Sequence, residues 1–359
     1  MIEPREHLRP IYRTSERDEG RAEFICLDRN ERASPIADDV FRAMMASVSV
    51  RDLMAYPDAG PLVSRLARVL GLPESWIAET AGSDNAIRRT FMAYLRPGAA
   101  VVSPSPSYAM YDIYTRIFQG TPRQIVYEAD GRLDVSAMVA TITPDVGIVV
   151  LANPDQPMGA VLPAADVERV IARAADAGAV CLVDEAYFPF HSETVVLLVR
   201  RFENLIVVRT FSKYPGCAGI RLGYAVAQPN LIEGLMKVRG GNEVSGVSLA
   251  LGCHLLDHPE IAEDFRRAVE IGRQAFNAQA RSLGFETPLC VANFQLLRCP
   301  AWLTPSRLAA ALERRRFLVK TGFTHPAIAD CIRVSLNGVD VMQPFAVALS
   351  EAVRELQSA

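Results

Sequence analysis

Lysine is rare in this chain: only Lys213, Lys237 and Lys320 occur among 38 lysine and arginine residues. Lys213 lies in the stretch RTFSKYPGCAGIRLG, eight residues before Arg221. An amine can lose its proton and attack a carbonyl to form a Schiff base, whereas a guanidinium stays protonated and unreactive. Lys213 is therefore the first candidate catalytic residue, and a carbonyl compound is its expected target.

Polar side chains follow four apolar runs that indicate buried strands. The runs AAVVS, VGIVVLA, AVCLVDE and NLIVVRT alternate with amphipathic segments, a pattern typical of a mostly parallel sheet between helices. In such open α/β sheets, ligands bind beyond the carboxyl ends of the strands. The residues that follow these runs include Tyr108, Asn153, Asp184, Tyr187, Thr210, Ser212 and Lys213. We expect them to line one crevice, although polar strand ends are common in any α/β protein.

A turn before a predicted helix offers a place for an anion. Gly82, Ser83 and Asp84 directly precede apolar residues at helical spacing over 86–95. The free N–H groups and the dipole of a helix N-terminus can hold a phosphate, but the same residues also suit an ordinary helix cap. Combined with an imine-forming lysine, Arg221 and a buried acid, the turn indicates pyridoxal phosphate, an aldehyde cofactor that carries a phosphate.

Seven motifs occur together in the order and spacing of one known family. They are YPD at 56–58, GSDNAI at 82–87, SPSYAMY at 105–111, NPDQPMG at 153–159, VDEAY at 183–187, RTFSKYPGCAGIRLG at 209–223 and CIRVS at 331–335. Through them the chain resembles, from about residue 24 onward, the class I and II aminotransferases of fold type I, and most closely their histidinol-phosphate aminotransferase branch. The resemblance implies an α/β fold, with a large domain around a mostly parallel seven-stranded sheet and a smaller α+β domain.

The resemblance also implies roles at the cofactor. Lys213 matches the lysine that forms the Schiff base, Asp184 the carboxylate that pairs with the pyridine nitrogen, and Tyr108 the aromatic ring stacked on the cofactor. We take these three as catalytic. Asn153 and Tyr187 match groups that hydrogen-bond the phenolic oxygen of the cofactor. The implied phosphate ligands are the N–H groups of Ser83 and Asp84, with Thr210, Ser212 and Arg221.

Two further positions concern the substrate and a partner subunit. Arg333 matches the arginine that binds a substrate carboxylate, which a guanidinium can hold through two parallel hydrogen bonds. Tyr56 matches a tyrosine that reaches the phosphate from the neighbouring subunit, so the resemblance implies a homodimer with shared active sites. The implied reaction moves an amino group between a small amino acid or amino alcohol, phosphorylated or otherwise anionic, and a keto acid.

Several residues depart from the pattern of that branch. Asp155, Gln156 and Met158 stand where it usually has Asn, Asn and Thr, and Lys320 stands where it has an arginine for the substrate phosphate. The identity of donor and acceptor therefore stays open, as does the binding of an anion by Lys320. A decarboxylase or a specialised lyase, cyclase or oxidase of the same fold is the alternative, because the cofactor can weaken more than one bond at the α-carbon. A ligand-sensing regulator would need a DNA-binding module before the resemblance, where only about 23 residues stand.

Composition limits the partners and the compartment. The net charge of −3 gives no basic field for nucleic acid or an anionic membrane, and the charged N-terminus without a long apolar run predicts a cytoplasmic protein. Seven scattered cysteines suit reduced thiols, and His254 and His258 have no further ligands near them in the sequence, so we expect no metal. We expect an arm with part of the small domain at 1–45, the large domain at 46–243 and the small domain at 244–359.

Overall fold

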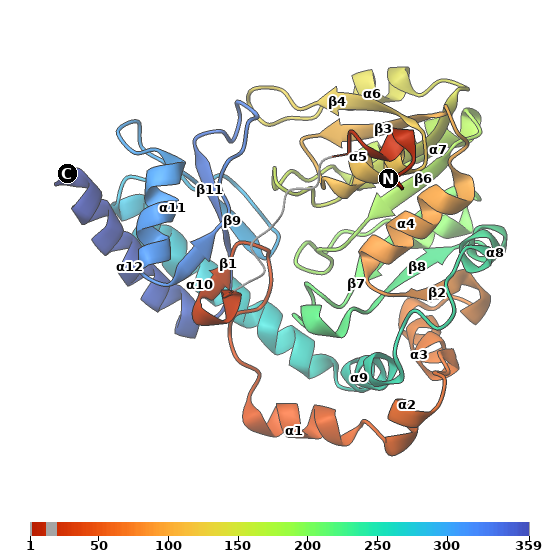
Figure 1. Ribbon diagram of the computed structural model, residues 1–359, viewed down its shortest axis with the longest axis horizontal. Coiled ribbons are helices and arrows are strands. Elements are labelled where there is room, and N and C mark those ends of the chain that lie inside the picture. Colours follow the sequence, from red (N-terminus) through yellow and green to blue (C-terminus); the bar gives the residue numbers. More distant parts are fainter. Residues whose placement is uncertain (1, 12–19, 359) are drawn as a thin grey trace.

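The computed structural model describes residues 2–11 and 20–358, which form two domains (Figure 1). The larger domain contains a seven-stranded sheet in the order β2-β8-β7-β6-β5-β3-β4. Its strands are β2 (Ile77–Thr80), β3 (Ala100–Ser105), β4 (Thr121–Val126), β5 (Val146–Ala152), β6 (Val180–Asp184), β7 (Leu205–Thr210) and β8 (Gly223–Ala227). Neighbouring strands from β7 to β4 are parallel, and β8 is antiparallel to β7 and to β2. The predicted α/β fold with a mostly parallel sheet is confirmed.

Helices cover both faces of this sheet, which explains why the central strands are continuous apolar runs. Val149 and Leu151 of β5 belong to the core on one face, and Ile148 and Val150 belong to the core on the other. The first face is covered by α3 (Gly60–Leu70), α6 (Val135–Thr141), α7 (Ala164–Asp176) and α9 (Gly246–Asp257). The second face is covered by α4 (Ser83–Tyr94), α5 (Met110–Ile117) and α8 (Pro229–Lys237).

The smaller domain combines two short sheets with three helices. β9 (Phe294–Arg298) pairs antiparallel with β11 (Cys331–Ser335), and β1 (Ile25–Leu27) pairs parallel with β10 (Phe317–Val319). An antiparallel bridge between Lys320 and Arg333 connects the two sheets. The helices α10 (Pro259–Ser282), α11 (Pro305–Arg314) and α12 (Val339–Gln357) enclose an apolar core with them. The pairing of β1 shows why the N-terminal arm belongs partly to this domain.

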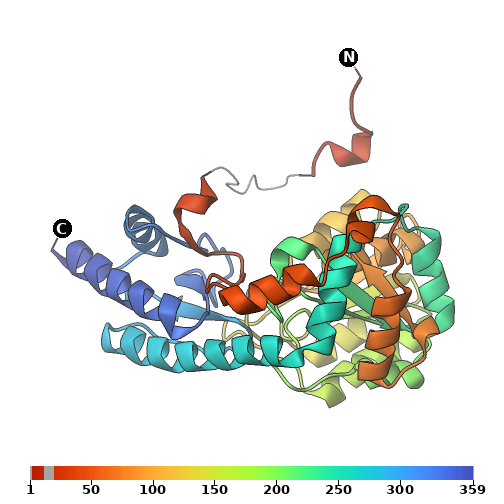
Figure 2. The ribbon, with the colours of Figure 1, turned by 90° about the horizontal axis from the view of Figure 1, so that it is seen from below.

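The boundary expected at residues 243 and 244 differs from the packing of the helix that follows it. Helix α9 falls within 244–359, yet its Leu249, Leu251 and Leu255 pack in the core of the large sheet. The chain changes direction at His258, and α10 then leads into the small domain (Figure 2). One continuous amphipathic pattern therefore contains two helices that serve different cores. The expected arm at 1–45 and the small domain at 244–359 include residues 1, 12–19 and 359, which lie outside the described residues.

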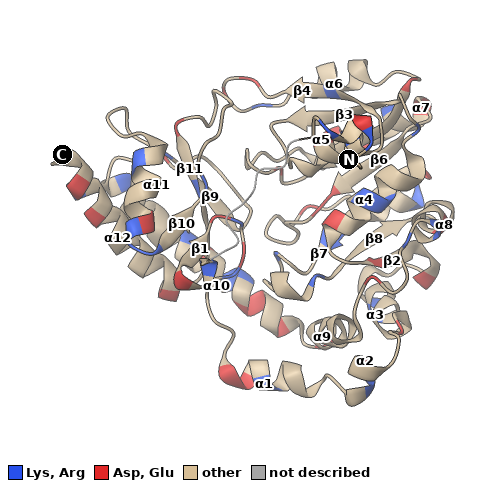
Figure 3. Ribbon diagram, viewed as in Figure 1, with Lys and Arg blue, Asp and Glu red and all other residues tan. Residues whose placement is uncertain are grey.

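The remaining elements are short. They are α1 (Asp38–Ala46), α2 (Val50–Met54) and the 3-10 helices η1 (Glu6–Leu8), η2 (Arg21–Glu23), η3 (Glu74–Trp76), η4 (Val196–Arg200) and η5 (Ala218–Ile220). Within the described ranges, none of the helices combines the length and the apolar character needed to span a membrane. Acidic and basic residues are interspersed along the elements of both domains (Figure 3).

Candidate active site

Lys213 follows β7 in a turn and directs its amine toward the segment after β1. Its Nζ donates a hydrogen bond of 2.7 Å to the carbonyl oxygen of Arg29. Burial, together with the positive charge of Arg333, lowers the pKa of Lys213 to about 8. A substantial fraction of this amine is therefore deprotonated slightly above neutral pH, which is the form that attacks a carbonyl.

Asp184 ends β6 with its carboxyl group buried in the sheet edge. Its Oδ2 accepts a hydrogen bond of 2.8 Å from the hydroxyl of Tyr111, and its Oδ1 accepts one of 3.0 Å from the N–H of Ala186. Burial raises the pKa of Asp184 to about 6, while these two hydrogen bonds act in the opposite direction. Asp184 is thus a buried acid that a nearby cationic group would keep ionised.

Tyr108 is held in place by two aromatic neighbours and one carboxylate. Its hydroxyl donates to Oδ1 of Asp84 at 3.2 Å, while Tyr114 donates to Oδ2 of the same carboxylate at 2.9 Å. The ring of Tyr108 meets that of Tyr111 edge to face, with centroids 5.5 Å apart. The orientation of the Tyr108 ring is therefore set by contacts on its edge and at its hydroxyl.

A cradle for an anion lies where α4 begins. Gly82 has a φ of +84°, and an added Cβ would stand 2.8 Å from Nη2 of Arg221, so only glycine lets this guanidinium reach the start of the helix. A Cβ on Gly223 would lie 2.8 Å from the N–H nitrogen of Ser83. The first N–H groups of α4 have no acceptor within the helix. Backbone donors and a guanidinium thus meet at one place, as a phosphate requires.

Two hydroxyl groups complete this cradle. Ser212 Oγ accepts from Nη1 of Arg221 at 3.3 Å and from the hydroxyl of Thr210 at 3.0 Å. Thr210 and Ser212 are 8% and 7% exposed, so both hydroxyls are buried beside the guanidinium. The residues present therefore fit the phosphate group of a cofactor bound beside them.

Asn153 and Tyr187 have different surroundings. The carboxamide of Asn153 bonds to the backbone of Leu162 through both of its heavy atoms, at 2.9 and 3.0 Å. One hydrogen of its amide nitrogen is left for another acceptor. The hydroxyl of Tyr187 accepts a hydrogen bond of 2.8 Å from Nδ2 of Asn30, which leaves its own proton to donate. Tyr187 is thus presented to the site, whereas Asn153 chiefly secures the loop that follows β5.

Arg333 approaches from the small domain. It is 5% exposed, its Nη2 donates to the carbonyl oxygen of Asp28 at 2.7 Å, and its guanidinium lies 5.5 Å from the ring centre of Phe294. Lys320 is its direct backbone partner, with N–H···O bonds of 3.0 and 2.8 Å. Directly opposite residues project to the same face of a sheet, so two cationic side chains emerge side by side.

The family model for class I and II aminotransferases matches residues 24–343. The chain belongs to this family. Over 336 residues, 92% of each chain, it is 32% identical to histidinol-phosphate aminotransferase 1 of Burkholderia lata. Over 342 residues it is 30% identical to histidinol-phosphate aminotransferase 2 of Gluconobacter oxydans, with 94% of this chain and 93% of that one covered.

Solved structures agree with this assignment. Histidinol-phosphate aminotransferase from Sinorhizobium meliloti, in complex with pyridoxal phosphate, is 26% identical with a TM-score of 0.81, and the match covers 93% of this chain and 92% of that one. L-threonine-O-3-phosphate decarboxylase from Porphyromonas gingivalis has a TM-score of 0.74 at 21% identity over 92% and 99% of the two chains, which shows a shared fold alone. The chain is a pyridoxal-phosphate-dependent aminotransferase of fold type I.

Three residues of this aminotransferase site were not identified from the sequence. Tyr111 and Tyr114 bind the carboxylates of Asp184 and Asp84, and they follow Tyr108 at intervals of three residues, a helical spacing that could have indicated a shared role. Asn30 bonds Tyr187 across 157 positions of the chain and adopts a φ of +56°. No local pattern predicts that contact, because it depends on how the two domains meet.

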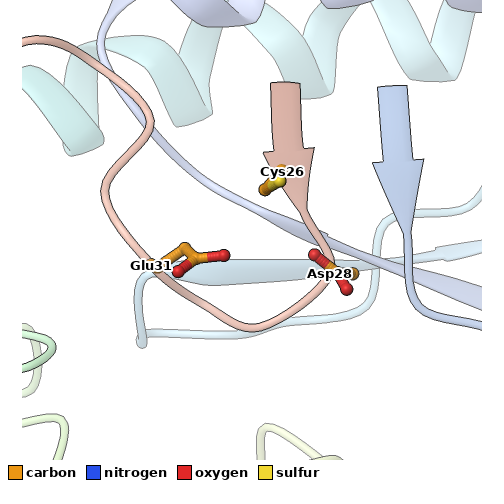
Figure 4. A group of neighbouring side chains, drawn as sticks. All are labelled: Cys26, Asp28 and Glu31. Carbon is orange, nitrogen blue, oxygen red and sulfur yellow. The ribbon is translucent and has the colours of Figure 1, made fainter. Parts of the chain in front are cut away.

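Tyr56 lies apart from these residues, whereas the acidic residues near β1 adjoin them through the carbonyl oxygen of Asp28, which accepts a hydrogen bond from Arg333. Tyr56 is 89% exposed directly after α2. Ligand atoms of Cys26, Asp28 and Glu31 lie within 4.8 Å of one another (Figure 4). Arg21 bonds Asp28 at 2.6 Å and also pairs with Glu31, and Arg29 lies 3.8 Å from Asp28, so two guanidinium groups balance the two carboxylates of this cluster.

Proposed function

We propose that this aminotransferase takes its amino group from a small amino acid or amino alcohol that is phosphorylated or otherwise anionic, and passes it to a keto acid. The observation that carries the proposal is the backbone pairing of Lys320 with Arg333. The charge of Arg333 also lowers the pKa of Lys213. Directly opposite residues project to the same face of a sheet, so one anionic group could accept hydrogen bonds from both side chains. The names of the relatives, which refer to histidinol phosphate, support a phosphate as this anion.

The residue roles at the cofactor follow from the placement described above. When bound, pyridoxal phosphate supplies an electron sink for the bonds at the α-carbon of the donor. Lys213 would carry it covalently, and its amine would move the proton of the α-carbon once the donor has taken its place. Asp184 would hold the protonated ring nitrogen, and Tyr108 would cover the ring.

The other predicted ligands would hold the edges of the cofactor. Tyr187 would donate to the phenolic oxygen of the cofactor. Asn153 would contribute only the second hydrogen of its amide nitrogen, because its Oδ1 and its first amide hydrogen already bond the backbone of Leu162. The phosphate would take the N–H groups of Ser83 and Asp84, the hydroxyls of Thr210 and Ser212, and the guanidinium of Arg221. A glycine at position 82 supports this arrangement, since any Cβ there would collide with Arg221.

We also propose a homodimer with shared sites, in the cytoplasm. Exposed apolar side chains gather on α1 and α2: Phe41, Met45, Val50, Leu53 and Met54 are between 44% and 82% exposed, and Tyr56 follows them at 89%. Apolar patches of this kind mark interfaces between protein chains. The seven cysteines are free thiols in the structure, which supports a reducing compartment.

A donor panel tests the proposed reaction. Holoenzyme is mixed with histidinol phosphate, O-phosphothreonine and their unphosphorylated counterparts, while the visible absorption of the cofactor, carbon dioxide and dissolved oxygen are followed together. We expect loss of the cofactor absorption with phosphorylated donors, recovery on addition of a keto acid, and no change in either gas. Carbon dioxide release or oxygen uptake would instead identify the alternative decarboxylase or oxidase.

Variants at position 320 test the anion site. Lys320→Met should raise KM for phosphorylated donors about 10- to 100-fold, the effect of losing one charged hydrogen bond, and Lys320→Arg should retain most of the affinity. Lys237→Met, at an exposed lysine on α8, is the matched control. Equal KM values for Lys320→Met and the wild type would contradict the proposal that Lys320 helps to bind the anion of the donor.

A further inference from the structure

The loop 153–159 contains three of the departures from the family pattern; Asp155 binds Tyr127, and Met158 shares an apolar cluster with it. Asp155 is 1% exposed, and its Oδ2 accepts a hydrogen bond of 2.7 Å from the hydroxyl of Tyr127. Its Oδ1 accepts one of 2.6 Å from the hydroxyl of Ser107. Met158 packs with Tyr127 in one apolar cluster. The loop therefore holds the Tyr127 side chain at its hydroxyl and along its ring.

The N–H of Tyr127 donates to the carbonyl oxygen of Ser105 in the large domain at 2.9 Å, and several of its other contacts are made by the small domain. Its ring shares the apolar cluster with Leu296, Ala327, Ile328 and Cys331, and Phe323 packs against the same group. His325 Nε2 donates to the carbonyl oxygen of Tyr127 at 2.8 Å, and the N–H of Ala327 donates to Nδ1 of His325 at 3.2 Å. Both ring nitrogens of His325 are used with the proton on Nε2. Tyr127 is thus a joint between the two domains.

The segment on the far side of this joint leads directly to Arg333. Arg298 on β9 binds both oxygens of Asp330 at 2.6 Å and the carbonyl oxygen of Ala327 at 2.8 Å. The N–H of Cys331 bonds to the carbonyl oxygen of Ile328 at 3.0 Å, and Cys331 opens β11. The stretch 327–331 is therefore braced, and a displacement at Tyr127 would be transmitted to the strand that carries Arg333.

We propose that Tyr127 and Asp155 are positioning residues of the active site: their hydrogen bond sets the small domain so that Arg333 and Lys213 reach the anion and the amine of one donor. Neither residue needs to touch the substrate for this role. The inference rests on the proposed function, because the donor must bind Arg333 through an anion. A misplacement of about 1 Å can cost about 100-fold in such a site.

The chemistry of Asp155 suits a joint of fixed geometry. A buried carboxylate is costly unless its oxygens are hydrogen-bonded, and Asp155 receives one hydroxyl on each oxygen. Burial raises the pKa of Asp155 to about 7, while the hydrogen bonds from Ser107 and Tyr127 act in the opposite direction and favour the ionised form. An apolar side chain in place of Asp155 could pack against the ring of Tyr127, but it would not fix the direction of the Tyr127 hydroxyl.

The affinity for a dicarboxylate distinguishes a positioning role of Tyr127 and Asp155 from an effect on the stability of the protein alone. The wild-type holoenzyme and the variants Tyr127→Phe, Asp155→Ala and Asp155→Asn are titrated with maleate by calorimetry, and the affinity for pyridoxal phosphate is measured in parallel. We expect Tyr127→Phe and Asp155→Ala to weaken maleate about 10-fold or more and to raise KM for the donor with kcat little changed. Cofactor affinity should stay within about twofold in both. Asp155→Asn, which can accept one hydroxyl and donate to the other, should restore most of the affinity.

Two further readings complete the test. Hydrogen exchange of the amides at 323–331 should rise in Tyr127→Phe. The double variant with Asp155→Ala should lose no more maleate affinity than Asp155→Ala alone, since that variant already lacks the bond to Tyr127. Tyr94→Phe, which removes a hydroxyl bonded to Leu231 within the large domain, should behave as the wild type.

Unchanged maleate affinity and exchange in Tyr127→Phe, or an equal loss of cofactor affinity, would overturn the positioning role. Failure of the proposed function would look different. In that case the wild type itself would not transaminate any anionic donor, whereas the effects of the variants on maleate and on exchange would still decide the role of the joint.

Discussion

Tyr111 donates a 2.8 Å hydrogen bond to Oδ2 of Asp184, and the tyrosine is 1% exposed. This bond acts against the burial that raises the pKa of Asp184 to about 6. Tyr111→Phe should therefore raise the pKa of Asp184 further, so that the acid limb of the kcat profile moves to higher pH. Loss of a charged hydrogen bond of about 1.5–3 kcal/mol raises the pKa by about 1 to 2, which corresponds to a loss of about 2- to 15-fold in kcat at pH 7.

The matched control lies on the same helix. Tyr114→Phe removes a hydrogen bond to Asp84 and leaves Asp184 bonded, so the acid limb should keep its position. The measurement is kcat between pH 5 and pH 9 at saturating substrate. An unshifted limb in Tyr111→Phe would mean that this tyrosine does not control the ionisation of Asp184.

The buried amine of Lys213 should make the stability of the apoprotein depend on pH. The folded-state pKa of Lys213, about 8, lies below the ordinary value of 10.5, so between these values the unfolded state binds more protons and stability rises with pH. At pH 7 the full cost of burying the charge is present. Apoprotein with Lys213→Met should be the more stable form at pH 7, by at most about 3 kcal/mol, and the gap should close near pH 10.

Urea unfolding midpoints of the two apoproteins at pH 7, 8, 9 and 10 measure this gap. Lys237→Met, at an exposed position, controls for the loss of a lysine as such. A gap that stays constant over this range would show that the amine of Lys213 titrates as a solvated group.

A buried ion pair supports the strand ends that carry Asp184 and Thr210. Glu185 and Arg209, each next to one of them in the chain, are 3% and 6% exposed and bond at 2.7 Å. Arg209→Met leaves the carboxylate buried and should cost about 3–5 kcal/mol of unfolding free energy, whereas Arg209→Met combined with Glu185→Gln should cost clearly less. Thermal and urea unfolding measure both.

A surface pair gives the reference for this experiment. Arg169 bonds Asp166 at 2.8 Å with its side chain 54% exposed, so Arg169→Met should change stability by less than about 1 kcal/mol. If Arg209→Met were as mild as Arg169→Met, the Glu185 carboxylate would have found another partner or taken up a proton.

The exposed Tyr56 allows a test of shared sites. If the protein is the proposed homodimer, the variants Lys213→Ala and Tyr56→Ala can be mixed, dissociated in mild urea and reassociated. If Tyr56 serves the site of the partner subunit, each heterodimer contains one site with both residues intact, and kcat/KM for pyridoxal-phosphate-dependent turnover should recover in the mixture. Recovery of cofactor affinity in the heterodimer is the second reading. A mixture no more active than the average of its parents would place Tyr56 outside the partner's site.

Local chemistry was enough to predict much of the site. Candidates for it could be named because parallel strands bring their carboxyl ends to one edge of a sheet, and because an amine can form an imine whereas a guanidinium stays protonated. These candidates include Lys213, Asp184, Tyr108 and Arg221. The sheet was predictable for a similar reason, since strands covered on both faces must be apolar at every position. The edge strand β4 is not a continuous apolar run, because several of its side chains are exposed, and it was therefore not predicted from the sequence.

Sequence by itself determined which side chains can react and roughly where along the chain the strands end. Tertiary structure alone decided what holds them: Asn30 against Tyr187, Asp155 against Tyr127, and Lys320 beside Arg333. It also decided that α9 packs on the large sheet although α10 continues its apolar pattern. The physical reason is that strand and helix periodicity depend on neighbours a few residues away, whereas these contacts join positions from 13 to 157 residues apart and exist only after the chain has folded.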